Sequence, residues 1–157
     1  MIRVFLLDDN EPVRRVLREV LEADDGIVVV GEASSAVEAR ALVLATRPDV
    51  VVLDVQLPDG SGLEVCGEIR ATNPEIRCVM LSAFADDQAL EAAAAAGASG
   101  YLLKQVRRVD YVAAIHAVAA GKSLLDREGG VSTRSDEVDG LTTDGAGPAR
   151  PDSRPDR

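Results

Sequence analysis

Three aspartates placed at the ends of two short hydrophobic runs constrain the fold of this chain more than any other feature. Asp8 and Asp9 directly follow the first run, and Asp54 closes the third. A lysine, Lys104, follows the fifth run. Parallel strands that end in this way bring their terminal side chains to one edge of a sheet, where ligands bind at the point at which strand order reverses. The pattern therefore predicts an α/β fold with an acidic site at that edge.

Short β-branched runs alternate five times with helical patterns along the chain. The expected strands are 2–7, 27–32, 49–53, 76–81 and 100–103. The first expected helix starts after its N-cap, Asn10. The second and third start at capping boxes, Ser35–Glu38 and Ser61–Glu64, and end before Pro48 and Pro74. The fourth and fifth are expected at about 87–96 and 107–120. Right-handed crossovers place such helices on both faces of a parallel sheet. We expect a doubly wound, flavodoxin-like (βα)5 sheet of order 2-1-3-4-5, which puts the acids of strands one and three together.

Length and composition favour one domain followed by a tail. Of the 157 residues, 1–125 carry the alternating pattern, whereas 126–157 are dominated by Gly, Pro, Ser, Thr, Asp and Arg. Such a segment buries too little apolar area to offset its ordering entropy, so we predict that it is disordered. The net charge of -10 and the 3% aromatic content lack the basic surface of a nucleic-acid binder. The chain as given is not expected to bind DNA unaided.

Two cysteines and one histidine are interpreted as structural. Cys66 and Cys78 match no zinc or redox spacing and are expected to be reduced thiols in the core. His116 lies on the fifth predicted helix, far in sequence from every acid of the site. The first apolar run is too short for a secretory signal, and no run of 18 apolar residues occurs. These features predict a soluble cytoplasmic protein without a membrane segment.

The clustered acids indicate a cation site. Two unit charges about 4 Å apart repel by roughly 4 kcal/mol at an effective dielectric near 20, so three ionised carboxylates either raise a pKa or bind a divalent ion. Mg²⁺ prefers oxygen ligands and is commonly held by one or two carboxylates together with phosphate oxygens. A carboxylate beside Mg²⁺ and an ammonium group is suited to attack phosphorus and form an aspartyl phosphate.

Four segments follow one another at a characteristic spacing: 6–10 (LLDDN), 52–62 (VLDVQLPDGSG), 80–83 (MLSA) and 97–104 (GASGYLLK). In this order and at this spacing they resemble the receiver domain of two-component response regulators. The resemblance covers residues 2 to about 122. Within the family the chain looks most like the LuxR-type (NarL/FixJ) branch, in particular its actinobacterial dormancy-survival regulators.

The resemblance implies a role for each residue of the acidic site. Asp54 would accept the phosphoryl group from the phosphohistidine of a sensor histidine kinase. Mg²⁺ would be bound directly by Asp9 and Asp54, through water by Asp8, and by the backbone carbonyl of Gln56. Lys104 would pair first with the carboxylate of Asp54 and then with the phosphoryl oxygens.

The resemblance also implies a conformational switch next to the site. Ser82 would hydrogen-bond the phosphoryl group and draw its loop inward, and Tyr101 would turn its ring from solvent into the vacated space, which is a shift between two packings. Gln56 and Phe84 stand where the family controls access of hydrolytic water, so we expect bulky Phe84 to prolong the phosphorylated state. Gln105 stands where relatives usually carry proline or aspartate, so a cis peptide is not expected there.

Two further features concern partners and output. The fifth helix has two apolar stripes. One consists of Tyr111, Ile115 and Val118, and the other of Val109, Val112 and Ala113. One stripe is expected to face the sheet, and the other is a candidate homodimer or partner surface. LuxR-type regulators continue into a helix-turn-helix domain that starts after a Leu-Thr dipeptide. We hypothesise that Leu141-Thr142 is a remnant of that junction, left by a truncation or frame change.

Three functions compete at this point. The first is a receiver that catalyses its own phosphorylation and slow dephosphorylation, without being a conventional enzyme, and that acts through a protein partner or as a phosphate sink. The second is an aspartyl-phosphate hydrolase of the haloacid-dehalogenase type, which usually needs a second aspartate two positions after the nucleophile, where this chain has Gln56. The third is an interaction module that is never phosphorylated.

Overall fold

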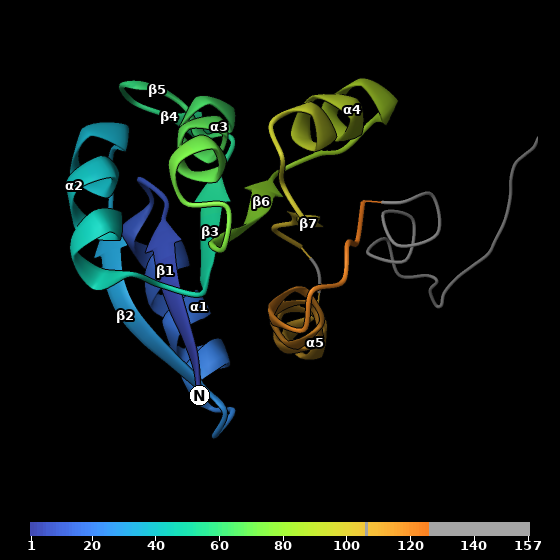
Figure 1. The fold of residues 1–157 in the computed structure, drawn as a ribbon. Helices are drawn as coiled ribbons and strands as arrows, with labels where there is room; N and C mark the ends of the chain where they lie inside the picture. Colours follow the sequence, from blue (N-terminus) through green and yellow to red (C-terminus); the bar gives the residue numbers. More distant parts are fainter. Residues whose placement is uncertain (106, 126–157) are drawn as a thin grey trace, which may run out of the picture.

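The computed structural model describes residues 1–105 and 107–125 and contains a five-stranded parallel sheet with helices on both faces (Figure 1). The strand order is β2-β1-β3-β6-β7. This confirms the doubly wound (βα)5 class and the predicted order 2-1-3-4-5, because β4 and β5 form a separate two-stranded hairpin. The predicted disorder of 126–157, the domain boundary there and the Leu141-Thr142 hypothesis lie outside the described residues.

The sheet places the first and third strands side by side. Its strands are β1 (Ile2–Leu7), β2 (Ile27–Ala33), β3 (Val50–Asp54), β6 (Arg77–Ser82) and β7 (Gly100–Leu103). In the parallel pairing of β1 with β3, Leu7 lies opposite Leu53. The next residue of each chain segment is therefore an aspartate, and the two acids reach the same edge of the sheet. Every residue of β3 is buried, as expected for a strand covered on both faces.

Polar side chains cap the start of four of the five helices in the described residues. The helices are α1 (Glu11–Glu22), α2 (Ala36–Thr46), α3 (Gly62–Thr72), α4 (Asp87–Ala95) and α5 (Arg108–Ala119). The side chain of Asn10 accepts a hydrogen bond from the backbone N–H of Val13, as an N-cap does. One half of the capping box expected at α2 is present, because the Ser35 side chain accepts from the N–H of Glu38. The other half is not, because the Glu38 carboxylate accepts from the N–H of Ser34 and not from that of the N-cap residue.

The helices pack on the two faces of the sheet in separate layers. Helices α2, α3 and α4 cover one face, and α1 and α5 cover the other (Figure 1). On α5 the stripe formed by Tyr111, Ile115 and Val118 is buried against the sheet. Val109, on the second stripe, is 62% exposed. The two layers therefore cover both faces of the sheet.

The structural interpretation of the cysteines agrees with the fold, and the histidine lies away from the acids. Cys66 and Cys78 are buried free thiols. His116 Nε2 lies 2.9 Å from Asp24 Oδ2, next to the start of β2 and thus at the end of the sheet opposite the acids. Within the described part of the chain, no helix has the length and apolar character needed to cross a membrane.

A short hairpin between β3 and α3 was not expected from the sequence. Strands β4 (Gln56–Leu57) and β5 (Gly60–Ser61) pair antiparallel, and the chain then enters α3 at Gly62. The Gly62 N–H donates to the Val55 carbonyl over 2.8 Å. A Cβ atom at Gly62 would lie 1.9 Å from the backbone oxygen of Asp54. The close approach of α3 to the end of β3 therefore requires glycine at this position.

Replacement of Gly62 by alanine is expected to destabilise the protein strongly. The added methyl group would push the start of α3 away from Asp54, and overpacking of this kind costs about 1–3 kcal/mol. Urea unfolding of the Gly62→Ala variant measures the loss. Gly67→Ala on the same helix is the matched control, because no atom of the described residues lies within 4 Å of a Cβ there, and we expect it to stabilise the helix by about 0.5–1 kcal/mol. Equal stability of the two variants would contradict the close approach.

Candidate functional site

Three carboxylates meet at the carboxyl ends of β1 and β3. One oxygen from each of Asp8, Asp9 and Asp54 lies within 4.8 Å of the others. Asp8 and Asp54 are buried, with 1% and 6% of their surface exposed, whereas Asp9 is exposed. The sequence predicted this cluster from the strand ends alone, and the geometry brings the three residues together as expected.

Backbone N–H groups hold the two buried acids in place. Asp8 Oδ1 accepts from the N–H of Asn10 over 2.8 Å, and Asp54 Oδ1 accepts from the N–H of Gln56 over 3.1 Å. In each case one carboxylate oxygen is fixed by the residue two positions further along the chain. The second oxygen of each acid is turned toward the same cation, Lys104.

Lys104 bridges the two buried acids. Its Nζ lies 3.1 Å from Asp54 Oδ2 and 3.3 Å from Asp8 Oδ2, and its side chain is 27% exposed. The hydroxyl of Tyr111 on α5 donates to the backbone carbonyls of Leu103 and Lys104, over 3.1 and 2.9 Å. These bonds anchor the backbone from which the lysine reaches across the ends of the strands. The predicted pairing of Lys104 with Asp54 is thus present in the geometry.

The charges of this cluster are out of balance, and the pKa values reflect it. Burial raises the pKa of Asp8 above its ordinary value, and the neighbouring charge of Asp54 adds to the rise against the opposing effects of the Asn10 N–H and Lys104. Burial alone would lower the pKa of Lys104, but the hydrogen bond to Asp54 and the charges of both acids outweigh it, so its pKa is raised. The Lys104 ammonium is therefore favoured in its charged form, whereas burial disfavours the charged form of Asp8.

A hollow of about 320 Å³ opens above the acids. Most of the site residues singled out in the sequence lie in its walls. The full set of lining residues is Asp9, Asn10, Asp54, Gln56, Leu57, Pro58, Ser82, Ala83, Phe84 and Lys104. Ser82 closes β6 and is 7% exposed, and its Oγ accepts from the N–H of Phe84 over 3.4 Å. The ring of Phe84 is 60% exposed at the rim. Residues from four strand ends therefore surround one space large enough for a small anion.

Tyr101 lies beneath the loop that follows β6. It is 3% exposed, and its hydroxyl donates to the backbone carbonyl of Phe84 over 2.8 Å. The ring is thus already in the inward orientation that the resemblance associated with the switched state. The rotation itself stays a prediction.

An arginine that the sequence did not single out supports the acidic loop. Arg14 on α1 donates through Nη1 to the backbone carbonyl of Asp8 and through Nε to Glu32 on β2, the latter over 3.1 Å. The Asp8 N–H in turn donates to the Ala33 carbonyl. Both sides of the Asp8 backbone are therefore fixed. Partners 18 residues apart, such as Arg14 and Glu32, leave no local pattern from which to find them.

A second unpredicted contact ties the loop after Asp54 to α2. The carboxylate of Asp59 accepts from the N–H groups of Ala36 and Val37, over 2.8 and 3.1 Å. These are free N–H groups of the first turn of a helix, which favour a nearby negative charge. The two bonds lower the pKa of Asp59, with the bond from Ala36 contributing most.

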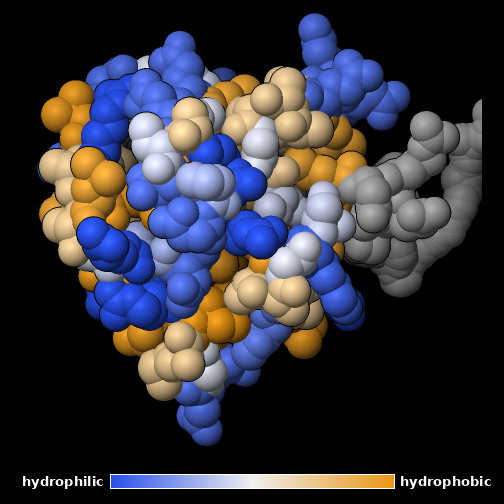
Figure 2. Space-filling model, viewed as in Figure 1, coloured by the Kyte–Doolittle hydropathy of each residue, from blue (hydrophilic) through white to orange (hydrophobic). Residues whose placement is uncertain are grey.

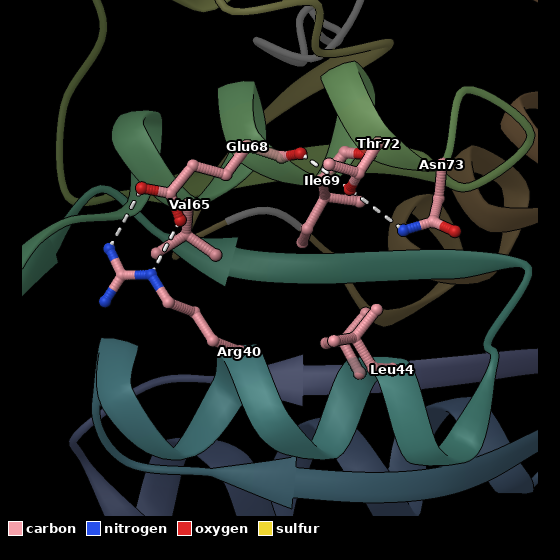
Figure 3. A pocket seen from close by; sticks show the side chains of 8 residues that line it. Arg40, Leu44, Val65, Glu68, Ile69, Thr72 and Asn73 are labelled. Atoms are coloured by element: carbon pink, nitrogen blue, oxygen red, sulfur yellow. Dashed lines mark hydrogen bonds and ion pairs between the residues drawn. The ribbon is translucent and has the colours of Figure 1, made fainter.

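The structure has another hollow, between α2 and α3, that lacks the features of a chemical site. It measures about 210 Å³, and its lining surface is mainly apolar, with Leu44, Val65 and Ile69 among the residues around it (Figure 3). Arg40 closes one end through two bonds to Glu68, over 2.6 and 3.2 Å. Figure 2 shows apolar surface over the neighbouring α2. We therefore assign the chemistry to the acidic hollow.

Comparison with known protein families gives one family for most of the chain. The family described as "Response regulator receiver domain" matches residues 4–116. Among curated proteins, the DNA-binding transcriptional activator DevR/DosR of Mycobacterium tuberculosis is 44% identical over 151 residues, which cover 90% of this chain and 70% of that protein. The transcriptional regulatory protein LiaR of Bacillus subtilis is 36% identical over 126 residues, covering 80% of this chain and 60% of that protein. The chain thus spans about 60–70% of the length of these two relatives.

Solved structures agree with this result. The signal receiver domain of NarL from Mycobacterium tuberculosis superposes with a TM-score of 0.74 at 31% identity, covering 77% of this chain and 98% of that one. A two-component response regulator of the LuxR family from Aurantimonas superposes with a TM-score of 0.75 at 36% identity, covering 78% of this chain and 88% of that one. The resemblance to the LuxR-type (NarL/FixJ) branch is confirmed in both fold and sequence.

The raised pKa of Asp8 predicts that its charge destabilises the fold at neutral pH in the absence of a divalent ion. When burial raises the pKa of an acid in the folded state, its neutral form favours folding at pH values below the pKa of the unfolded state, near 3.9. This contribution to the free energy of unfolding is lost as the pH rises through the pKa of the folded state. Asp8→Asn should therefore increase the free energy of unfolding at pH 7, and the difference should disappear below about pH 4. Denaturation across this pH range measures it, with exposed Asp25→Asn as control. A destabilised Asp8→Asn variant at pH 7 would contradict the prediction.

Proposed function

The chain belongs to the response regulator receiver family of two-component systems, and from this premise we propose that it accepts a phosphoryl group on Asp54 from the phosphohistidine of a sensor histidine kinase, with Mg²⁺ as cofactor. The observation that carries the proposal is the position of Asp54. Its carboxylate lies at the floor of the acidic hollow, with one oxygen fixed by the Gln56 N–H and the other 3.1 Å from Lys104 Nζ. An oxygen held in this way is ready to attack phosphorus.

The residues present fit a magnesium ion. Among the described residues, Lys104 is the cation that bridges the two buried carboxylates, at 3.1 Å from Asp54 and 3.3 Å from Asp8. Within the same residues, the buried Asp8 Oδ2 has no hydrogen-bond partner, although it lies in ion-pair range of Lys104. We propose that Asp9 and Asp54 bind Mg²⁺ directly, Asp8 through water and Gln56 through its backbone carbonyl. When bound, the ion would neutralise charge on the carboxylates and on the incoming phosphoryl group.

The side chains around Asp54 suggest the course of the transfer. The Asp54 carboxylate oxygen forms a bond to phosphorus while the bond from phosphorus to the kinase imidazole nitrogen breaks, and the nitrogen keeps the electron pair. The Lys104 ammonium exchanges part of its contact with Asp54 for a phosphoryl oxygen. The hydroxyl of Ser82, at the wall of the same hollow, donates a hydrogen bond to another phosphoryl oxygen.

The output is proposed to pass through a protein partner or a second copy of the chain. Contacts of Ser82 with the phosphoryl group would favour the packing in which Tyr101 is buried, which is a population shift. The second stripe of α5, where Val109 is exposed beside α1 and Val112 is partly buried, is our candidate homodimer surface. DevR/DosR is described as a DNA-binding transcriptional activator, and by that likeness we infer a role in transcriptional control. Codons for a helix-turn-helix domain downstream of this sequence, in any frame, would support that inference.

A hydrolase of the haloacid-dehalogenase type is the alternative from another class. Its chemistry needs an acid and base two residues after the nucleophile, and the amide of Gln56 cannot serve as one. The two functions differ in turnover, because a hydrolase releases phosphate repeatedly whereas a receiver retains one phosphoryl group per chain.

The central test is phosphorylation by a small donor. Wild-type protein incubated with acetyl phosphate and Mg²⁺ is expected to gain the mass of one phosphoryl group, and Asp54→Asn to gain none. Asp25→Asn, which changes an exposed aspartate outside the hollow, should behave as wild type. Intact-mass spectrometry with and without a chelator reads all three proteins. Absence of a mass gain in wild type, or an equal gain in Asp54→Asn, would refute the proposal.

Phe84 is predicted to slow hydrolysis of the aspartyl phosphate. Its ring stands at the rim of the hollow and is 60% exposed, where it can shield the phosphoryl group from water. Phe84→Ala should shorten the lifetime of the phosphorylated form about threefold to tenfold, which corresponds to about 0.7–1.4 kcal/mol in the barrier. The decay of phosphorylated protein after removal of the donor measures this lifetime. Phe84→Leu, which keeps an apolar side chain at the rim, should fall between the two, and an unchanged lifetime in Phe84→Ala would remove the shielding role.

A further inference from the structure

Three consecutive backbone carbonyls at the end of β6 are each held by a donor from the segment around β7. The carbonyls belong to Ser82, Ala83 and Phe84. Their donors are, in that order, the backbone N–H of Lys104 at 2.8 Å, the side-chain Nε2 of Gln105 at 3.2 Å and the hydroxyl of Tyr101 at 2.8 Å. The loop after β6 is therefore fastened residue by residue to the strand that carries Lys104.

The three bonds differ in strength and in kind. The bond from the Lys104 N–H continues the ladder between β6 and β7, and the bond from Tyr101 is made by a side chain that is 3% exposed. The bond from Gln105 is made by an exposed side chain and joins two loops. Its amide can therefore be changed without opening the core.

The peptide group that Gln105 holds is also the one that contacts the Ser82 hydroxyl. The carbonyl of Ala83 and the N–H of Phe84 belong to one planar peptide, in which they point in opposite directions. The carbonyl accepts from Gln105, and the N–H donates to Ser82 Oγ over 3.4 Å. A restraint on the carbonyl therefore sets the direction of the N–H, and the N–H sets the orientation of the hydroxyl.

We propose that Gln105 is a positioning residue for phosphoryl transfer to Asp54, acting on Ser82 through this single peptide. The inference rests on the proposed function. Because Ser82 Oγ accepts from the Phe84 N–H, its own proton is left free to be donated. That proton is the one a phosphoryl oxygen in the hollow requires. Gln105 does not line the hollow, so its contribution is to orient the donor and not to touch the reacting atoms.

The test is a double-mutant cycle on the phosphorylation rate. Gln105→Met keeps the length and neutrality of the side chain but removes the donor, and we expect the maximal rate with acetyl phosphate to fall about threefold to tenfold, the range for one hydrogen bond, with little change in the half-saturating donor concentration. In the Ser82→Ala background the same change should have no further effect, because the group that Gln105 orients is gone. Gln88→Ala, which alters an exposed glutamine of α4, is the control and should match wild type.

The outcomes separate this inference from the proposed function. Equal loss from Gln105→Met with and without Ser82 would overturn the inference, since it would indicate a general effect on the loop. An unchanged rate in Gln105→Met, with wild type phosphorylated normally, would overturn it as well. A wild-type chain that gains no phosphoryl group would instead refute the proposed function, and the role of Gln105 with it.

Discussion

The repulsion between three carboxylates at one edge of the sheet is the constraint on which the rest of the site depends. Asp8 and Asp54 are buried there, and the ammonium of Lys104 bridges them at 3.3 and 3.1 Å. A single ammonium group cannot neutralise three ionised carboxylates, so the edge of the sheet keeps a local excess of acidic groups. Nearby interactions keep the acids in place despite their repulsion, including the Asn10 and Gln56 N–H groups and the guanidinium of Arg14. This uncompensated charge supports the proposed binding of a divalent ion at the three acids.

The fold and the acid cluster could be predicted because their signals are local and periodic. The apolar run at β3 is buried throughout and ends in Asp54. Adjacent residues therefore predict the length of the strand, its character as a strand buried on both faces, and the position of its acid. The two-residue strands β4 and β5 gave no such signal, since pairing of four residues has no periodicity. The contacts of Arg14 with Glu32 and of Asp59 with α2 join segments 18 and more than 20 residues apart. Such pairings follow from packing, which the sequence pattern does not encode directly.

The two sides of the acidic hollow are held differently. The β1 and β3 side is fixed by contacts with several elements: Arg14 and Glu32 brace the Asp8 backbone, and glycine at 62 lets α3 approach the Asp54 carbonyl closely. The β6 side is a short loop whose carbonyls are held by single hydrogen bonds from Tyr101 and Gln105. Local opening follows the weakest contacts, so the loop after β6, despite its three hydrogen bonds, is the part of the site to which we assign the proposed switch.

The bond from Asp59 to the first turn of α2 has a consequence for the construction of chimeric proteins. The two N–H groups of α2 and the carboxylate that binds them lie on separate segments, on either side of β3. A graft that exchanges α2 between two such proteins therefore transfers half of an interaction. Unless the recipient also has an acceptor at the position of Asp59, the new helix begins with unsatisfied donors and the loop beside the site loses its anchor. The natural unit of exchange in this fold extends from α2 through the hairpin after β3.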